Sequence, residues 1–275
     1  MRSLRRNMPR WRSQSCRIIG IITTRFTGGY DLCGVKNQLV YEYEKVEDLG
    51  LKGYKVIQNK DGFCFGSDAV LLARFAAPKK GARVLDMCTG TGIIPVLLWG
   101  LNDLEAEEAI EIVPEVADMA KRTMLLNGLE DKIRVTCGDL KSCAEIYGRH
   151  AFDAVTCNPP YMNFGGGLVN PKDKLAVARH EIACTLNDVV KMSKAVLKPC
   201  GKLFMVHRAD RMCDVVSTFR KYGIEPKRLQ IVYPSAEKAA SLILIEGAEG
   251  GKPFLKLEKP LFMYDSDGNY IQSLK

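Results

Sequence analysis

The stretch RVLDMCTGTGIIPVLLW, residues 83–99, decides the fold of this chain. Residues 83–87 form a short apolar run that is typical of a buried strand, and the following turn contains Gly90 and Gly92 before an apolar run with helical spacing. Glycines between a strand and a helix let the backbone approach a ligand, and a helix N-terminus can receive a carboxylate or a phosphate. A dinucleotide-binding turn needs a third glycine where Pro95 stands, so the stretch argues against NAD.

Around this stretch, strand patterns alternate with helix patterns from about residue 40 onward. We expect further strands that end near residue 112 and that span residues 133–137, 152–157, 202–207, 230–233 and 241–245. We expect helices at residues 114–127, from Leu186 to about Leu197, and from Asp210 to a C-terminal end marked by Gly223. Such alternation predicts an α/β fold with a mostly parallel sheet, helices on both faces and ligands at the carboxyl ends of the strands.

The composition excludes several classes of protein. A chain of 275 residues with 47% hydrophobic and 26% charged residues is long enough for one large or two modest globular domains, and it is neither disordered nor fibrous. No apolar run approaches the roughly 20 residues of a transmembrane helix. The ten cysteines are scattered and never form C-x-x-C, so we expect reduced thiols in the cytoplasm, with neither a disulfide framework nor a metal site.

Charge divides the chain into unequal parts. Residues 1–34 contain seven Arg, no Lys and one acid, without regular apolar spacing. We expect this N-terminal extension to be upstream sequence translated from a start codon placed too early; a disordered basic arm and a structured element are the other interpretations. Residues 35–80 are expected to form a cap or lid, and residues 81–275 the main domain. Within it, residues 195–260 hold 12 basic and 7 acidic residues, which is where we expect a polyanionic partner.

Two acids follow the next two expected strands. Glu111 stands at the end of the second strand, and Asp139 follows the third, within residues 137–140. Taken alone, each acid is more often a solvated carboxylate or a helix cap. Because the carboxyl ends of parallel strands meet at one edge of a sheet, the two acids and the glycine-rich turn are expected to form one ligand site.

The sequence Asn158-Pro159-Pro160-Tyr161 directly follows the apolar run 152–157. An amino nitrogen conjugated to a ring or a carbonyl is a poor nucleophile, and two acceptors that hold its hydrogens favour a pyramidal nitrogen. The Asn158 side-chain oxygen and the Pro159 carbonyl can do this, because the prolines stiffen the loop, and Tyr161 offers a stacking face. A general base is then unnecessary, and the rate comes from orientation and electrostatics. A plain Pro-Pro turn is the alternative.

With these residues the chain resembles the class I methyltransferases that use S-adenosylmethionine, whose motif I matches residues 86–92 except that Cys88 replaces the first glycine of D-x-G-x-G-x-G. The resemblance implies a Rossmann-like, mostly parallel, seven-stranded twisted sheet. It also implies that Glu111 accepts both ribose hydroxyls of the cofactor and that Asp139 receives its adenine amino group. The expected cofactor-binding residues are Asp86, Cys88, Gly90, Gly92, Glu111, Asp139, Asn158, Phe65 and Asp68.

Residues 36–270 resemble, more specifically, the bacterial tRNA1(Val) (adenine-37-N6)-methyltransferases. The resemblance rests on residues 58–72 ahead of motif I, on Ala178-Arg179-His180-Glu181 after the Asn-Pro-Pro-Tyr motif, and on residues 206–208, 226–228 and 251–255. It implies methyl transfer from S-adenosyl-L-methionine to N6 of an adenine in tRNA, at A37 beside the anticodon, by a cytoplasmic monomer with no membrane or metal partner. A base in a single-stranded loop costs less to extrude than one in a duplex.

The same resemblance suggests further contacts. Residues 63–68, with Phe65 and Asp68, are expected to cover the cofactor, and a buried aromatic pair at the sheet edge is the alternative. Arg179 and His180 are expected to order the loop 162–180 or to contact the substrate. The expected substrate and RNA contacts are Tyr161, Arg179, His180, Arg208, Arg211, Lys227 and Arg228, although charges of this kind are often merely solvated.

Two other functions stay open on the sequence. A glutamine-N5 methyltransferase acting on release factors shares the Asn-Pro-Pro-Tyr motif, but it would carry a helical substrate domain before motif I, for which residues 35–80 are too few. A non-catalytic RNA-binding protein of the same fold is the third interpretation, favoured only by Cys88.

Overall fold

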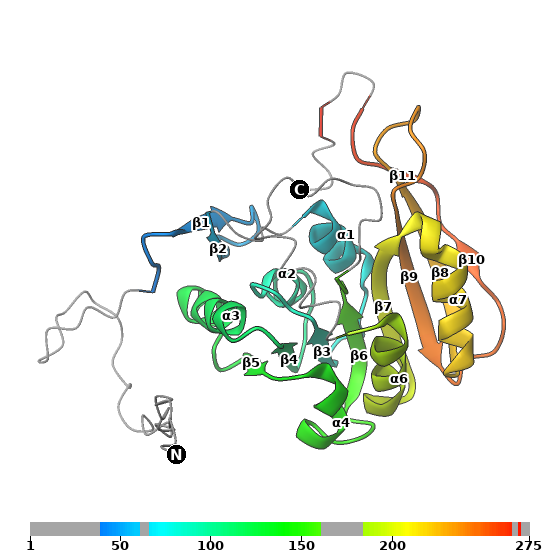
Figure 1. Cartoon of the computed structure of the whole chain (residues 1–275), viewed down its shortest axis with the longest axis horizontal. Helices are drawn as coiled ribbons and strands as arrows, with labels where there is room; N and C mark the ends of the chain where they lie inside the picture. Colours follow the sequence, from blue (N-terminus) through cyan, green and yellow to red (C-terminus); the bar gives the residue numbers. More distant parts are fainter. Residues whose placement is uncertain (1–38, 61–65, 161–183, 266–268, 271–275) are drawn as a thin grey trace, which may run out of the picture. The chain divides into compact units, whose positions relative to one another are not determined.

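The computed structural model describes residues 39–60, 66–160, 184–265 and 269–270, which are coloured in Figure 1. The N-terminal extension expected at residues 1–34 lies outside the described residues. The described residues form a large sheet with helices on both faces, together with a small two-stranded hairpin.

The large sheet confirms the predicted α/β fold. Its strands follow the order β5-β4-β3-β6-β7-β9-β8, and β9 is antiparallel to both of its neighbours whereas the other pairs are parallel. Two short strands that the sequence analysis did not predict run parallel to the outer edge of β8. The bounds are β3 Arg83–Met87, β4 Ala106–Glu111, β5 Ile133–Cys137, β6 Phe152–Cys157, β7 Leu197–Arg208, β8 Ile224–Tyr233, β9 Leu242–Glu249, β10 Lys256–Leu257 and β11 Leu261–Phe262.

Strands β3, β5 and β6 have the predicted bounds, whereas β7 and β8 begin earlier than predicted. Gly201 and Pro226 lie inside these two strands, although both residues indicate strand breaks in a sequence. The pairing of β6 with β7 shifts register across Gly201, and the pairing of β8 with β9 shifts register just after Pro226. Irregular pairing of this kind tolerates glycine and the missing N–H of proline.

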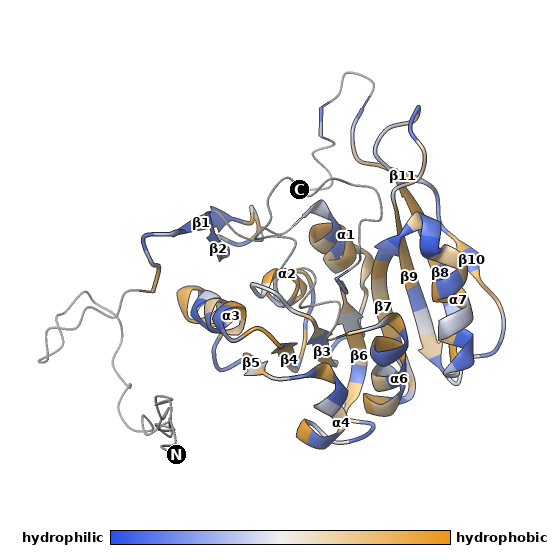
Figure 2. Cartoon of the chain, viewed as in Figure 1, coloured by the Kyte–Doolittle hydropathy of each residue, from blue (hydrophilic) through white to orange (hydrophobic). Residues whose placement is uncertain are grey.

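The helices cover the two faces of the sheet in two groups. One group is α1 Ser67–Phe75, α2 Ile93–Leu101 and α3 Pro114–Asn127, and the other is α4 Cys143–Ile146, α6 Leu186–Val196 and α7 Met212–Lys221. Short 3-10 turns precede α4 and α7 at Leu140–Ser142 and Ala209–Arg211. Two predicted starts are confirmed: Pro114 is the first residue of α3, and Thr185 and Asp188 form a capping box before α6. The third differs, because Asp210 lies in a 3-10 turn and α7 begins at Met212. In Figure 2, β7 and β9 are largely hydrophobic, whereas the visible side of α7 is largely hydrophilic.

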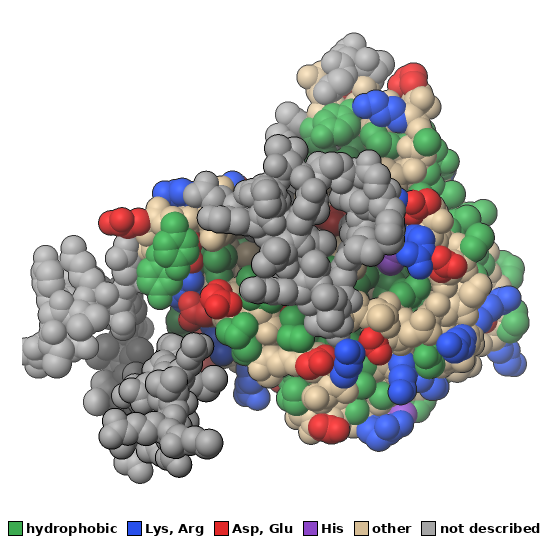
Figure 3. Space-filling model, viewed as in Figure 1, with side chains coloured by type: hydrophobic (Ala, Val, Ile, Leu, Met, Phe, Trp, Pro, Cys, Tyr) green, Lys and Arg blue, Asp and Glu red, His purple; other side chains and the backbone are tan. Residues whose placement is uncertain are grey.

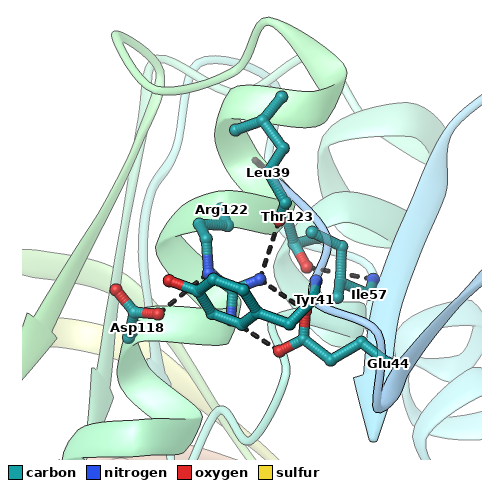
Figure 4. A network of polar contacts seen from close by, with 7 residues as sticks. All are labelled: Leu39, Tyr41, Glu44, Ile57, Asp118, Arg122 and Thr123. Carbon is teal, nitrogen blue, oxygen red and sulfur yellow. Dashed lines mark hydrogen bonds and ion pairs between the residues drawn. The ribbon is translucent and has the colours of Figure 1, made fainter. Parts of the chain in front are cut away.

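The hairpin of β1 Glu44–Asp48 and β2 Lys55–Asn59 packs against α3. Its anchor is Arg122 of α3, whose side chain is buried and whose guanidinium donates to both Glu44 oxygens at 2.7 Å and to Asp118 Oδ2 at 2.8 Å (Figure 4). The Arg122 guanidinium also lies 4.3 Å from the centre of the Tyr41 ring. Burial raises the pKa of Glu44, but the hydrogen bond and charge of Arg122 outweigh it and lower the pKa overall, so the pair is ionised.

Candidate cofactor and substrate site

The turn between β3 and α2 has three residues in the left-handed region. Their φ angles are +59° at Cys88, +57° at Gly90 and +85° at Gly92. For an L-residue this conformation costs about 1–2 kcal/mol relative to the right-handed one. Cys88 therefore holds the backbone in the conformation for which glycine is best suited, so its substitution for the first glycine of the motif leaves the shape of the turn intact.

The two glycines of the turn have different structural roles. A Cβ atom on Gly92 would lie 2.5 Å from Met124 Cε and 3.5 Å from the Ala120 Cβ atom, so Gly92 lets α2 begin against α3. A Cβ atom on Gly90 would meet no heavy atom within 4 Å. The Gly90 N–H donates to Glu111 Oε2 at 3.0 Å. Gly90 thus borders open space beside an acid, whereas the structure gives Gly92 a packing role.

The carboxyl ends of β4 and β5 bring the two predicted acids to one pocket. Glu111 is 2% exposed, and its two oxygens accept from the backbone N–H groups of Gly90 and Val113, both at 3.0 Å. Asp139 caps a 3-10 turn by accepting from the Lys141 N–H at 2.9 Å. The pocket is lined by Cys88, Ile110, Glu111, Ile112, Gly138, Asp139, Leu140, Pro160 and Cys184.

The pocket fits a nucleoside in its chemistry more than in its enclosed volume. A carboxylate is a pure acceptor with two oxygens, and vicinal ribose hydroxyls are donors of the kind that the Glu111 carboxylate can accept. Ile112 and Leu140 supply apolar surface for a flat base, and Gly138 adds no side chain to the pocket lining. The enclosed volume is only about 20 Å³, so a ligand of cofactor size must also use the open side of the pocket.

Asp86 lies beneath the turn and is absent from the pocket lining. It is fully buried, and the Thr156 hydroxyl donates to its Oδ1 atom at 2.6 Å. Burial raises the pKa of Asp86 to about 7, with the hydrogen bond from Thr156 opposing the shift. The structure thus gives this predicted cofactor ligand a position under the backbone that would carry the cofactor.

Three thiols meet at the base of the pocket. The side chain of Cys88 lies near those of Cys157 and Cys184, and Cys88 and Cys184 both line the pocket. The contact with Cys157, together with burial, raises the pKa of Cys88, so the thiol stays neutral. A neutral thiol is a weak nucleophile, so Cys88 contributes uncharged, apolar surface to the pocket.

The amide of Asn158 is held by a carboxylate from α1. Its Nδ2 atom donates to Asp68 Oδ2 at 3.1 Å, and Asp68 Oδ1 accepts from the Ala69 N–H at 2.9 Å. A carboxylate can only accept, so this contact fixes which side of the amide faces Asp68. Among the residues that the structure describes, none donates to Asn158 Oδ1. Pro159, whose carbonyl is the second predicted acceptor, follows as a buried residue.

This contact was not predicted from the sequence, in which Asp68 is expected to bind the cofactor. Asp68 and Asn158 are 90 positions apart, and no spacing or periodicity in a sequence relates the start of one helix to the end of a distant strand. Four other predicted site residues, Phe65, Tyr161, Arg179 and His180, lie outside the described residues, as does the loop 162–180.

Four of the seven predicted substrate and RNA contacts lie within the described residues, and each of these four has a partner within the fold. Arg208 pairs with Asp210 and Arg211 pairs with Asp214, while the Lys227 ammonium donates to the Lys252 carbonyl. Figure 3 agrees, because Lys and Arg side chains near α6 and α7 are interspersed with acidic ones.

Arg228 connects two elements of the fold. It pairs with Glu246 at 2.9 Å, donates to the Phe75 carbonyl at 2.6 Å and lies 4.0 Å from the centre of the Phe75 ring. Arg228 therefore joins β8 to α1.

His207, at the end of β7, is buried and neutral. Burial, followed by the charge of Arg211, lowers its pKa to about 4, and the Arg208 N–H donates to its Nδ1 atom at 2.9 Å. Within the described part of the chain, no cluster of His, Cys, Asp and Glu could hold a metal ion. The helices that the structure describes include none that is long and apolar enough to cross a membrane.

Comparisons with known proteins agree with this arrangement. The family described as "Methyltransferase small domain" matches residues 57–222, which is more than half of the chain. A protein of Porphyromonas gingivalis named tRNA1(Val) (adenine(37)-N6)-methyltransferase is 28% identical over 72% of this chain and 79% of its own length. One of the same name from Aliivibrio salmonicida is 23% identical over 75% of this chain and 86% of its own.

Solved structures share the fold at low sequence identity. A predicted O-methyltransferase from Agrobacterium tumefaciens has a TM-score of 0.60 at 19% identity and covers 75% of this chain and 93% of that one. A geranyl diphosphate C-methyltransferase from Streptomyces coelicolor, in complex with S-adenosyl-L-homocysteine, has a TM-score of 0.50 at 11% identity and covers 66% of this chain and 75% of that one. These likenesses show the fold alone.

Proposed function

This chain belongs to the methyltransferase small domain family, and from that premise we propose that it transfers a methyl group from S-adenosyl-L-methionine to the exocyclic N6 of an adenine in tRNA. The observation that carries the proposal is the Asn158 amide, held by Asp68 so that its oxygen is left as an acceptor, in the loop whose Pro160 lines the pocket of Glu111 and Asp139. The names of the relatives add the substrate class and the position, A37 of tRNA1(Val).

The residues of the pocket fit the cofactor by their donor and acceptor chemistry. Glu111 would accept the ribose hydroxyls, Asp139 the adenine amino group, and the open side of Gly90 would leave room for the backbone to approach the ligand. When bound, S-adenosyl-L-methionine supplies the electrophilic methyl group. The half-buried, neutral Cys88 adds no competing nucleophile next to this methyl group.

Asn158 and Pro159 prepare the nucleophile. The adenine amino group donates one hydrogen to Asn158 Oδ1 and the other to the Pro159 carbonyl, which favours a pyramidal nitrogen with its lone pair aimed at the methyl group. Asp68 keeps the amide from turning, because an inverted amide would present two donors to a donor. Most of the rate enhancement then comes from orientation and preorganised polar groups.

The two alternative functions have less support. A glutamine-N5 methyltransferase would carry a helical domain before the glycine-rich turn, and the described residues 39–60 and 66–82 instead hold a β-hairpin and helix α1. A non-catalytic RNA-binding protein would not need Asn158 to be oriented by a carboxylate.

The test is transfer of labelled methyl groups from S-adenosyl-L-methionine into total tRNA from a strain that lacks the gene, followed by nucleoside analysis. The variant Asn158→Ala is the test case, and Asn187→Ala, on the exposed surface of α6, is the matched control. We expect labelled N6-methyladenosine with the wild type and the control and none with Asn158→Ala. Cofactor binding without RNA labelling would favour a glutamine substrate or a binding protein.

A further inference from the structure

The segment 256–264 runs along the outer edge of β8 and ends at the carboxyl edge of the sheet. It is fixed there by backbone hydrogen bonds from Glu258 N to Leu229 O at 2.8 Å, from Met263 N to Tyr233 O at 2.9 Å, and from Tyr264 N to Pro234 O at 2.9 Å. The segment is thus ordered before any partner arrives, which lowers the entropic cost of using it for binding.

Side chains alternate along this segment, as they do in any strand. Leu261 and Met263 pack on the core cluster that contains α1, whereas Phe262 and Tyr264 point outward and are 37% and 40% exposed. Each exposed ring has an aromatic neighbour: the Phe262 ring lies 5.6 Å from that of Tyr233, and the Tyr264 ring lies 5.6 Å from that of Tyr270. Figure 3 shows hydrophobic side chains at the surface above β11, beside basic ones.

The aromatic segment is linked to Asn158 through the first turn of α1. The Ser67 hydroxyl at the start of α1 donates to the Met263 sulfur at 3.9 Å, and the following residue, Asp68, accepts from Asn158. Met263 separates Phe262 from Tyr264 in sequence. One turn of α1 therefore touches both the proposed acceptor amide and the aromatic segment, so a nucleic acid strand that places its base at Asn158 passes close to these rings.

Cations flank the aromatic segment on the side of α1. Arg74 and Lys259 are exposed, and among the described residues neither forms an ion pair. Both line a cavity of about 520 Å³ between α1, β8 and the segment, together with Gln230. Burial and the neighbouring Tyr264 raise the pKa of the Tyr270 phenol, and the charge of Arg74 partly opposes this. Glu258, the acid in the cavity wall, is paired with Lys256.

We propose that Phe262 and Tyr264 form a stacking surface for unpaired bases of the RNA substrate, with Arg74 and Lys259 contacting its phosphates; this rests on the proposed function. Exposed aromatic rings with cations along the neighbouring surface are an arrangement by which proteins bind single-stranded nucleic acid, because every base has a π-face and every nucleotide a phosphate. A protein partner would gain from the rings but not from two unpaired cations. The bases concerned are those next to the adenine that enters the Asn158 site.

The experiment compares the double variant Phe262→Leu/Tyr264→Leu with the control Phe254→Leu. Leucine keeps the apolar volume and removes the π-face. Phe254 is 77% exposed in the same C-terminal part of the chain, but it precedes β10, which pairs with Arg228 and Leu229 rather than with the carboxyl end of β8. The probe is an oligoadenylate of about ten nucleotides, within the site sizes usual for stacking proteins, with an RNA duplex of similar length as the second probe.

We expect the double variant to bind oligoadenylate about tenfold or more weakly than the wild type, with an unchanged salt slope, since no phosphate contact is lost. Duplex binding, the affinity for S-adenosyl-L-methionine and the melting temperature should stay unchanged, and Phe254→Leu should match the wild type. With tRNA as substrate, the KM should rise while kcat is retained.

Equal oligoadenylate affinity of the wild type and the double variant overturns the proposal. So does an unchanged RNA affinity combined with lost self-association in sedimentation, which would assign the rings to a second copy of the chain. If the wild type methylates no tRNA while the double variant still loses oligoadenylate affinity, the proposed function fails and the stacking surface stands.

Discussion

Two carboxylate networks of this chain each join residues far apart in sequence. They differ in whether every polar group of the network has a partner within the described fold. Glu44 and Arg122 are 78 positions apart, Asp68 and Asn158 are 90 apart. In the first network, both carboxylate oxygens and both terminal nitrogens of the guanidinium are used inside the fold. In the second, the amide oxygen of Asn158 receives no donor from the described residues. A closed network stabilises, whereas an open one holds a group ready for a ligand.

The closed network should be the more costly one to break. Glu44→Ala leaves the buried Arg122 with the exposed Asp118 as its remaining carboxylate partner, so we expect a loss of up to about 3–5 kcal/mol in unfolding free energy, measured by urea denaturation at pH 7. The pKa of Glu44 is lowered in the fold, so the contribution of the pair is present above the ordinary carboxylate pKa and disappears as the pH falls through the lowered value. The difference between variant and wild type should therefore shrink in acid. Asp48→Ala, in the exposed part of the same hairpin, is the control.

Breaking the open network should lower the activity and leave the stability nearly unchanged. Asn158→Ala removes the proposed acceptor, and we expect kcat to fall about 100- to 1000-fold, the usual cost of one preorganised polar group at a reacting centre. The melting temperature and the affinity for S-adenosyl-L-methionine should change little, because the amide oxygen has no other described partner. A large loss of stability with full activity per folded molecule would reverse the comparison.

A variant of Asp68 distinguishes between two roles of this residue: orienting the Asn158 amide, and contacting the cofactor as the sequence suggested. Asp68→Ala frees the Asn158 amide to turn, so we expect kcat to fall by up to about 100-fold, as misplaced catalytic groups do. Cofactor affinity, measured by calorimetry, should be retained, and Asp68→Glu should recover part of the rate. A weaker cofactor affinity with unchanged kcat would support the original assignment. Asp103→Ala, which removes an exposed carboxylate paired with Lys80, serves as the control.

Glu107 extends the comparison to a carboxylate with no hydrogen-bond partner in the described part of the chain. Both of its oxygens are buried without a donor from those residues, and burial, with the charge of Asp86 adding to it, raises the pKa well above the ordinary value. A raised pKa favours the protonated form in the fold, so stability is highest in acid and falls as the pH rises above the ordinary carboxylate value. Glu107→Gln should remove this dependence and stabilise the protein at pH 8 by about 1–3 kcal/mol, with little gain at pH 5.

Thermal melts of the Glu107→Gln variant and the wild type between pH 5 and 8 check this prediction. Glu105→Gln, just before the same strand, is the matched control. Parallel melting curves at every pH would contradict the assignment of the pH dependence to Glu107.

Much of the fold was predictable because its signals are local. The strand bounds of β3, β5 and β6 follow from apolar runs between polar turns, and the start of α3 follows from Pro114. The early starts of β7 and β8 were not predictable, because Gly201 and Pro226 indicate a break unless the neighbouring strand shifts its register around them. The short strands β10 and β11 were not predicted either, because a strand of two residues is too short to show an alternating pattern in the sequence.

The candidate site divides along the same line. The sequence by itself determined that Glu111, Asp139 and Asn158 follow successive strands, and a parallel sheet then brings their positions to one edge. Only the tertiary structure decided that Gly92 packs on α3 while Gly90 borders open space, that Arg228 serves the fold, and that Asp68 orients Asn158. The physical reason is that periodicity and turn residues record what each segment does with its own backbone. Contacts between side chains 90 residues apart depend on where the packed core places the ends of those segments.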